Sequence, residues 1–74
     1  MSSVQKLAEN LADDVLAAQD EIGNDRLFIE IGAVLLSSSQ TLEEAFMTEC
    51  RVRLAEKKAR AALAAKLAEF RKGG

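Results

Sequence analysis

Few side chains in this sequence could do chemistry, and a single thiol is the strongest nucleophile among them. The chain has 74 residues without histidine, tyrosine or tryptophan, so carboxylates, lysines and Cys50 make up its acid–base set. No imidazole is present to deprotonate Cys50, although the neighbouring Arg51 and Arg53 are expected to lower its pKa. We interpret Cys50 as a small apolar residue rather than a catalytic one, and we expect no enzymatic activity.

Metal, phosphate and cofactor sites are not indicated either. The glycines are isolated except for the pair at the C-terminus, so no glycine-rich phosphate loop occurs. The acidic pairs Asp13-Asp14 and Asp20-Glu21 lack the spacing of a calcium-binding loop. Glu30 is the one charge in the most apolar run, where we expect it to reach solvent or pair with Arg26. The sequence therefore predicts no metal and no cofactor.

A basic segment, residues 51–60, is the candidate for binding nucleic acid, with polyanion contacts predicted at Arg51, Lys57, Lys58 and Arg60. Phosphate binding favours basic residues gathered on one face of a helix, whereas the basic residues of this segment point to several sides. No aromatic residue lies between them that could stack on a base. Residues 1–49 hold two basic and ten acidic residues, a net charge of −8, and residues 50–74 hold eight basic and two acidic, a net of +6. This split favours an acidic helix pair packed against a basic helix, and nucleic-acid binding stays the alternative.

Three helices are predicted to position these residues, the first over about residues 2–22. Ser2 and Gln5 have the spacing of a capping box. Apolar residues then recur at spacings of four and three, as in a helix seam: Val4, Ala8, Leu11, Val15, Ala18 and Ile22. Gly23 is suited to end this helix in a left-handed conformation, and Asn24 or Asp25 to cap the next one.

The most apolar run, residues 27–36, is predicted to form a second helix over about 25–37, because a strand would separate its apolar and polar residues poorly. Eight of its ten residues are apolar, so it is stable in water only if nearly its whole circumference is covered. It is too short to span a membrane, which takes about 20 apolar residues. Gly32 marks a place where another backbone could approach closely. The predicted core consists of Leu11, Val15, Phe28, Ile31, Val34, Leu35 and Phe46.

A long third helix is predicted over about residues 41–72, beginning at a capping box formed by Thr41 and Glu44. Its length, roughly 45 Å, exceeds what its two shorter companions can cover. Its apolar residues fall on two stripes, which indicates contact with a second body besides its own core. The predicted interface is Leu54, Ala61, Leu63, Ala65, Leu67 and Phe70. Cys50 lies on one of these stripes, so oxidation is expected to crosslink two chains if that stripe is the contact.

Taken together, these patterns predict a single all-α domain over residues 1–74, a helical hairpin followed by one long C-terminal helix. A chain this small gains little from one core, and its lone cysteine cannot form an internal disulfide, so we expect the bundle to be completed by self-association. The lone cysteine also indicates a cytoplasmic protein. The predicted function is a non-enzymatic interaction or scaffold module that forms a homo-oligomer, with a dimer favoured and another protein as a further partner. The alternative is a small nucleic-acid-binding or regulatory protein that uses the basic helix.

Overall fold

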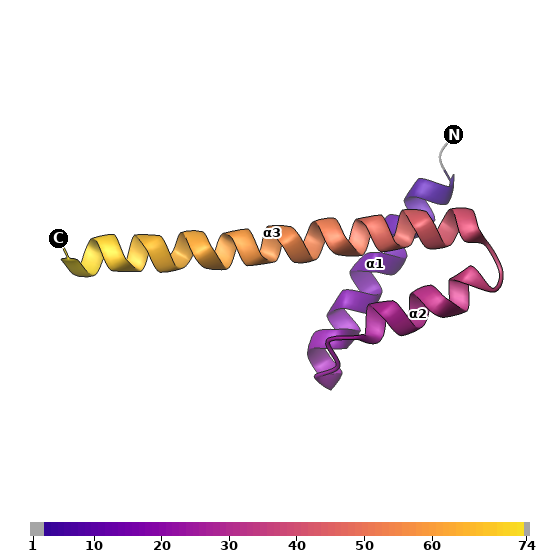
Figure 1. Ribbon diagram of the computed structural model, residues 1–74, viewed down its shortest axis with the longest axis horizontal. Coiled ribbons are helices and arrows are strands. Elements are labelled where there is room, and N and C mark those ends of the chain that lie inside the picture. Colours follow the sequence, from indigo (N-terminus) through magenta and orange to yellow (C-terminus); the bar gives the residue numbers. More distant parts are fainter. Residues whose placement is uncertain (1–2, 74) are drawn as a thin grey trace.

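The computed structural model describes residues 3–73, which form three α-helices joined by short turns (Figure 1). The helices are α1 (Ser3–Ile22), α2 (Leu27–Leu36) and α3 (Gln40–Gly73). This confirms the predicted all-α fold, and the described residues contain no strand. Ser2, predicted to cap the first helix, lies outside the described residues. The molecule measures 54 × 30 × 14 Å because α1 and α2 pack beside the first half of α3, while its second half projects alone (Figure 1).

The turn between α1 and α2 is shaped by a glycine, as predicted. Gly23 has a φ of +70°, a conformation that costs glycine little, and the Asn24 amide donates a 3.1 Å hydrogen bond to the Gln19 carbonyl. As predicted, Asn24 contributes to the start of α2, since its Oδ1 accepts a 3.0 Å hydrogen bond from the Arg26 amide and its carbonyl accepts one from the Leu27 amide. The buried Gln19 side chain, which was not predicted, satisfies the next amide, since its Oε1 accepts a 3.0 Å hydrogen bond from the Phe28 amide. Gln19 reaches it because the hairpin folds the last turn of α1 against the start of α2.

The turn between α2 and α3 is capped by a serine rather than by the predicted Thr41. The Ser39 Oγ accepts a 3.1 Å hydrogen bond from the Leu42 amide, which satisfies one of the free amides of the first turn of α3. The amides of Ser38 and Ser39 in turn donate to the Leu35 carbonyl at 2.9 and 2.7 Å. Ser39 thus ends the hydrogen bonding of α2 and caps α3 at the same time. Helix α3 therefore begins at Gln40, one residue before the predicted capping box at Thr41.

The core lies mainly between α1 and the first half of α3. Its buried apolar residues are Ala8, Ala12, Val15, Phe46, Met47 and Cys50. The side chains that α1 contributes are small, which lets α3 approach closely enough to enclose Phe46 and Cys50 completely. Larger side chains such as Leu16, Phe28 and Leu42 pack around this centre and remain partly exposed.

The predicted core residues divide into three groups. Val15 and Phe46 are buried at the centre, and a second group lies half-buried at its edge: Leu11, Phe28, Ile31 and Leu35. Val34 is 64% exposed, so its assignment to the core is wrong for the single chain. The ten-residue α2 touches its companions along one side only. Ile29 and Leu36 are consequently exposed as well, and the expected cover around this run is incomplete.

A close approach does occur at Gly32 between α2 and α3, but it is made by the Met47 side chain and not by a backbone as predicted. Gly32 is buried, and a Cβ at this position would lie 2.7 Å from the Met47 Sδ, well inside van der Waals contact. Alanine would therefore have to displace the Met47 side chain, which is flexible but itself buried.

Shortening a side chain at the centre of the core should lower the free energy of unfolding far more than shortening one on the outer side of α2. We expect Phe46→Ala to lower the free energy of unfolding by about 3–5 kcal/mol, enough to leave the chain largely unfolded. Val34→Ala is the control and should change it by less than about 0.5 kcal/mol, as at other exposed positions. Urea titration followed by helical circular dichroism measures both, and similar losses would contradict this assignment of the core.

The contact between Gly32 and Met47 predicts energetic coupling. Gly32→Ala should be less favourable in the parent than in a Met47→Ala background, because the smaller side chain leaves room for the new methyl group. Neighbours of this kind couple by about 0.5–3 kcal/mol. A double-mutant cycle from urea titrations gives the coupling, and strictly additive changes would mean that α2 and α3 do not approach here.

Candidate interaction surface

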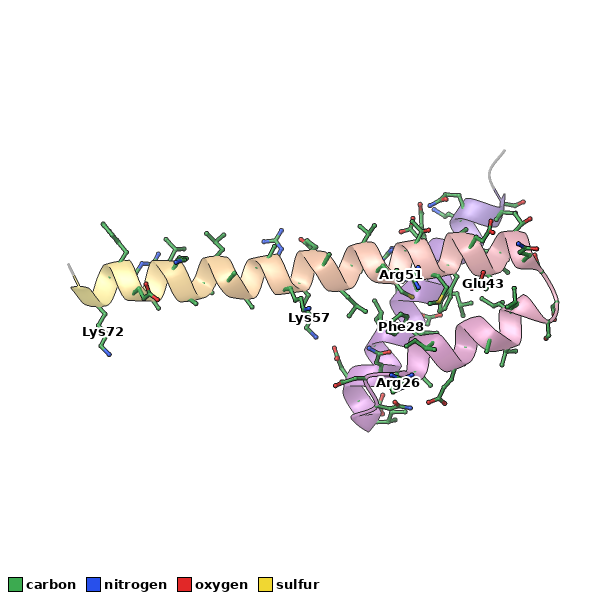
Figure 2. The ribbon with its side chains drawn as sticks, viewed as in Figure 1. Arg26, Phe28, Glu43, Arg51, Lys57 and Lys72 are labelled. Carbon is green, nitrogen blue, oxygen red and sulfur yellow. The ribbon has the colours of Figure 1, made fainter. Side chains whose placement is uncertain are left out.

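The second half of α3 projects from the three-helix head without intramolecular cover. Every residue from Ala55 to Gly73 is exposed, a length of about 28 Å at 1.5 Å per residue. Lys57 lies where this projection begins and Lys72 near its far end (Figure 2). The sequence holds the segment helical because alanine, leucine, lysine and arginine are strong helix formers, and Arg71 and Lys72 in the last turn favour the helix dipole.

One side of α3 carries large apolar residues that touch nothing in the chain. We call this the outer ridge, and its members with their exposed fractions are Val52 (60%), Leu63 (57%), Leu67 (40%) and Phe70 (76%). At about 100° per residue these four fall on one side of the helix. Three of the four lie in the projecting half, so the ridge extends well beyond the head.

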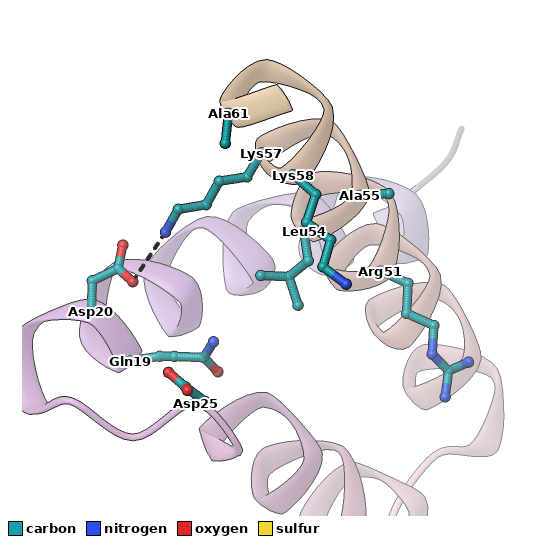
Figure 3. A pocket seen from close by; sticks show the side chains of 9 residues that line it. All are labelled: Gln19, Asp20, Asp25, Arg51, Leu54, Ala55, Lys57, Lys58 and Ala61. Atoms are coloured by element: carbon teal, nitrogen blue, oxygen red, sulfur yellow. Dashed lines mark hydrogen bonds and ion pairs between the residues drawn. The ribbon is translucent and has the colours of Figure 1, made fainter. Parts of the chain in front are cut away.

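The opposite side of α3 forms an open groove with the end of α1 (Figure 3). Its volume is about 730 Å³. Acidic residues line it from the hairpin, basic residues from α3, and Leu54 is its largest apolar residue; the full lining is Gln19, Asp20, Asp25, Arg51, Leu54, Ala55, Lys57, Lys58 and Ala61. The Lys57 Nζ lies 3.4 Å from the Asp20 Oδ1 across the groove. Both side chains are largely exposed, so this pair contributes little stability.

The six predicted interface residues do not share one face. Leu63, Leu67 and Phe70 belong to the outer ridge. Leu54 and Ala61 line the groove on the opposite side, and Ala65 follows Ala61 there by one turn. A single partner helix can cover only one of these faces. The outer ridge is the more apolar of the two, since beyond Leu54 the apolar residues that line the groove are alanines and stand beside Lys57 and Lys58.

The four predicted polyanion contacts divide between two places. Arg51, Lys57 and Lys58 line the groove, where Lys57 pairs with Asp20. Arg60 is not among the groove residues and pairs with Glu56 at 2.5 Å along α3, at the spacing of four that favours such pairs. Two of the four charges are thus engaged in ion pairs.

A cluster of ionic side chains fastens α1 to α3 beside the core, and we call it the Arg53 clamp. The Arg53 Nε donates a 2.9 Å hydrogen bond to the Asp13 Oδ1 of α1, and its Nη1 donates to the Glu49 Oε1 one turn away. The Gln5 Nε2 of α1 also donates to Glu49, at 2.6 Å. The hydrogen bonds from Arg53 and Gln5 hold the pKa of Glu49 below its usual value. Glu49 and Arg53 lie four residues apart on α3, a spacing at which such pairs form, whereas Gln5 and Asp13 come from a different helix.

Cys50 is a buried apolar residue, as the sequence indicated. It is fully buried in the core, where removal from water raises its pKa to about 11. Arg53 acts to lower this pKa, as expected, but desolvation outweighs its attraction and the net shift is upward. Crosslinking of two chains through Cys50 stays a prediction, and the burial of the thiol in the single chain argues against it. A protonated, enclosed thiol is inert, so Cys50 has a packing role.

Other potential sites are also not indicated by the geometry. Glu30 is exposed and accepts a 3.2 Å hydrogen bond from the Asn24 Nδ2. The described residues form no cluster of three potential metal ligands. Within the same part of the chain, no helix is both long enough and apolar enough to cross a membrane. Comparison with known proteins gives no match: no family model fits the chain, and no curated protein and no solved structure is significantly similar to it.

The Arg53 clamp predicts a specific dependence of stability on pH. Because folding lowers the pKa of Glu49, its contribution is complete above the unfolded value of about 4.5 and disappears as the pH falls through the lower folded value. The Glu49→Gln variant should therefore be less stable than the parent at pH 7. Its stability should also fall less than the parent's when the pH is lowered. Thermal unfolding between pH 7 and pH 3 measures this difference. Glu44→Gln is the control, because the hydrogen bond of Glu44 to Gln40 stays within α3. An unchanged pH profile for Glu49→Gln would show that the clamp contributes nothing.

Proposed function

We propose that this protein is a non-enzymatic helical interaction module that self-associates through α3, with a dimer as the favoured state. The observation that carries the proposal is the projecting half of α3, in which Leu63, Leu67 and Phe70 are exposed on one side. Burying one such side chain is worth about 1.5–3 kcal/mol. Because a small domain is only marginally stable, burying all three against a partner would add substantially to its stability. The exposure of the whole segment from Ala55 onward supports a partner that binds along the helix.

The distribution of charge supports a second copy of the chain as that partner. The projecting segment, residues 58–73, holds five basic residues and one acidic, a net charge of +4. Helix α1 holds five acidic residues and one basic, a net charge of −4. Two copies can therefore pair with opposite charges in contact, with the basic end of one chain beside the acidic helices of the other. Complementary charge of this kind favours specificity and fast association more than affinity. The lone cysteine supports the cytoplasm as the compartment.

Binding of a polyanion such as nucleic acid is the second candidate. It is supported by the same net charge of +4 and by Lys58, Lys66, Arg71 and Lys72, which make no ion pair within residues 3–73. The two functions respond differently to salt. Retention on heparin or DNA falls steeply as salt rises, whereas an apolar helix contact persists.

Replacing the apolar residues of the projecting half should abolish self-association. We expect the parent to sediment as a dimer and Leu63→Ser/Leu67→Ser/Phe70→Ser to sediment as a monomer, because the apolar contact is removed. The matched control is Ala61→Ser/Ala65→Ser/Ala68→Ser, which places three serines at the same spacing on the groove side of α3, opposite the outer ridge, and should remain dimeric. Sedimentation equilibrium at several concentrations distinguishes these states. A parent that is monomeric throughout overturns the proposal.

Truncation separates the role of the projecting segment from that of the head. A chain ending at Arg60 keeps all the buried residues, so it should fold but lose its oligomeric state. If it keeps both the parent's oligomeric state and its melting temperature, the contact lies elsewhere. A matching loss of both would show that folding depends on assembly.

A further inference from the structure

We infer that two copies of this chain pair with their α3 helices antiparallel, so that the projecting half of each lies along the first half of the partner's α3. This inference rests on the proposed self-association and specifies its direction. The contact is the outer ridge together with its continuation toward the start of α3. The alternative is a parallel pair, in which the two projecting halves lie side by side.

The spacing of residues along the ridge suits a helix pair over the full length of α3. Counted from its first turn, one side of the helix presents residues at alternating intervals of three and four: Leu42, Ala45, Glu49, Val52, Glu56, Ala59, Leu63, Lys66 and Phe70. Leu67 of the outer ridge falls outside this series, beside Lys66 at its edge. That is the spacing of a seam between two long helices. Its middle is open, since Val52, Glu56 and Ala59 are all exposed, and neither α1 nor α2 covers the seam there.

Charge along α3 favours the antiparallel direction. Residues 40–49 hold three acidic residues and no basic one, and residues 58–73 hold five basic and one acidic. A parallel pair places the two segments of +4 against each other. An antiparallel pair places each beside a segment of −3 and near the acidic α1 of the same partner. Like charges held together destabilise an interface, so they select against the parallel pair.

The apolar ends of the seam also match in the antiparallel direction. Leu42 and Ala45 at the start of α3 are only partly buried by their own chain, so they leave apolar surface for the partner. When the two seams are centred near Glu56, Phe70 of each chain comes opposite Leu42 of the other. The polar centre then brings Glu56 of each chain close to the partner's Glu56 and Arg60, and each Glu56 already pairs with its own Arg60. Polar residues in a seam fix register at some cost in stability.

The antiparallel arrangement also closes. Each chain offers the same surface and receives the same surface, which is the contact of a two-fold dimer and leaves no free ridge for further chains. Pairing of the basic segment with the acidic head in a head-to-tail manner would instead leave one free end on each assembly and produce chains of increasing length. A discrete dimer is therefore part of the inference.

Distances between spin labels distinguish the two directions. We would label Lys72→Cys in the Cys50→Ala background and measure the distance between the two labels of the dimer by pulsed electron resonance. In the antiparallel pair each label lies 16 residues from the centre, so the expected separation is about 50 Å at 1.5 Å per residue. In the parallel pair the labels lie across one helix contact, about 10–20 Å apart. Each labelled chain is also measured alone. Mixing labelled Lys72→Cys with labelled Gln40→Cys should add a short distance that neither chain gives alone only in the antiparallel pair, because a parallel pair already gives short distances in each singly labelled dimer.

Each outcome has a distinct meaning. A short distance between the two Lys72→Cys labels overturns the antiparallel direction while leaving self-association intact. A monomer in sedimentation overturns self-association and this inference with it, and a ladder of larger species overturns the closed pair. If Cys50→Ala does not fold, the measurement is repeated with Cys50 retained, because its buried thiol should not react during brief labelling of an exposed cysteine. The singly labelled chains thus decide the direction in either background.

Discussion

The close contact between α1 and α3 is the constraint on which the rest of the structure depends. Ala8 and Ala12 present almost no side chain, so α3 comes near enough for Phe46 and Cys50 to be completely enclosed. On one flank of this contact the Arg53 clamp joins the helices, and farther along Lys57 reaches Asp20. Because the core is so small, removing one large side chain from it leaves little to oppose the conformational entropy of unfolding.

This contact lies at one end of α3, and that position determines what the molecule exposes. Helix α1 is 20 residues long and crosses only the first half of the 34-residue α3 (Figure 1). Helix α2 packs against both α1 and α3, and its first turn is hydrogen-bonded to the Gln19 side chain. Neither can reach beyond Ala61, so the outer ridge and the basic segment project into solvent together. The exposed surface thus follows from helix lengths and crossing position, and it combines an apolar side with a net positive charge.

The same constraint places the chain's reactive side chains. Its one thiol is enclosed and protonated, and the described carboxylates lie on the surface or in ion pairs such as those of Arg53 with Asp13 and Glu49. The groove beside α3 contains carboxylates and amines but no thiol, and the sequence has no imidazole. What the molecule does present is extended helix surface, which suits recognition of another helix along its length.

The sequence by itself determined the three helices and placed their boundaries to within two residues, because these depend on local chemistry. Alanine, leucine, glutamate and lysine favour helix, Gly23 takes the left-handed turn, and the absence of a breaker after Thr41 allows one long helix. Pairs four residues apart, such as Glu49 and Arg53, were also predictable, since both partners lie on one helix.

Only the tertiary structure decided which face of each helix is buried. The apolar spacing of α1 suggested Leu11 and Val15 for the centre. Val15 does lie there, but beside Ala8 and Ala12 rather than Leu11, because periodicity cannot reveal that small residues are needed where two helices approach most closely. For the same reason Val34 is exposed, although its helix is apolar on nearly every side. The burial of Cys50 and the capping of α2 by Gln19 likewise depend on a neighbouring helix. Local sequence specifies a helix and its apolar residues. Which of these residues a neighbouring helix covers is decided only when the whole chain packs.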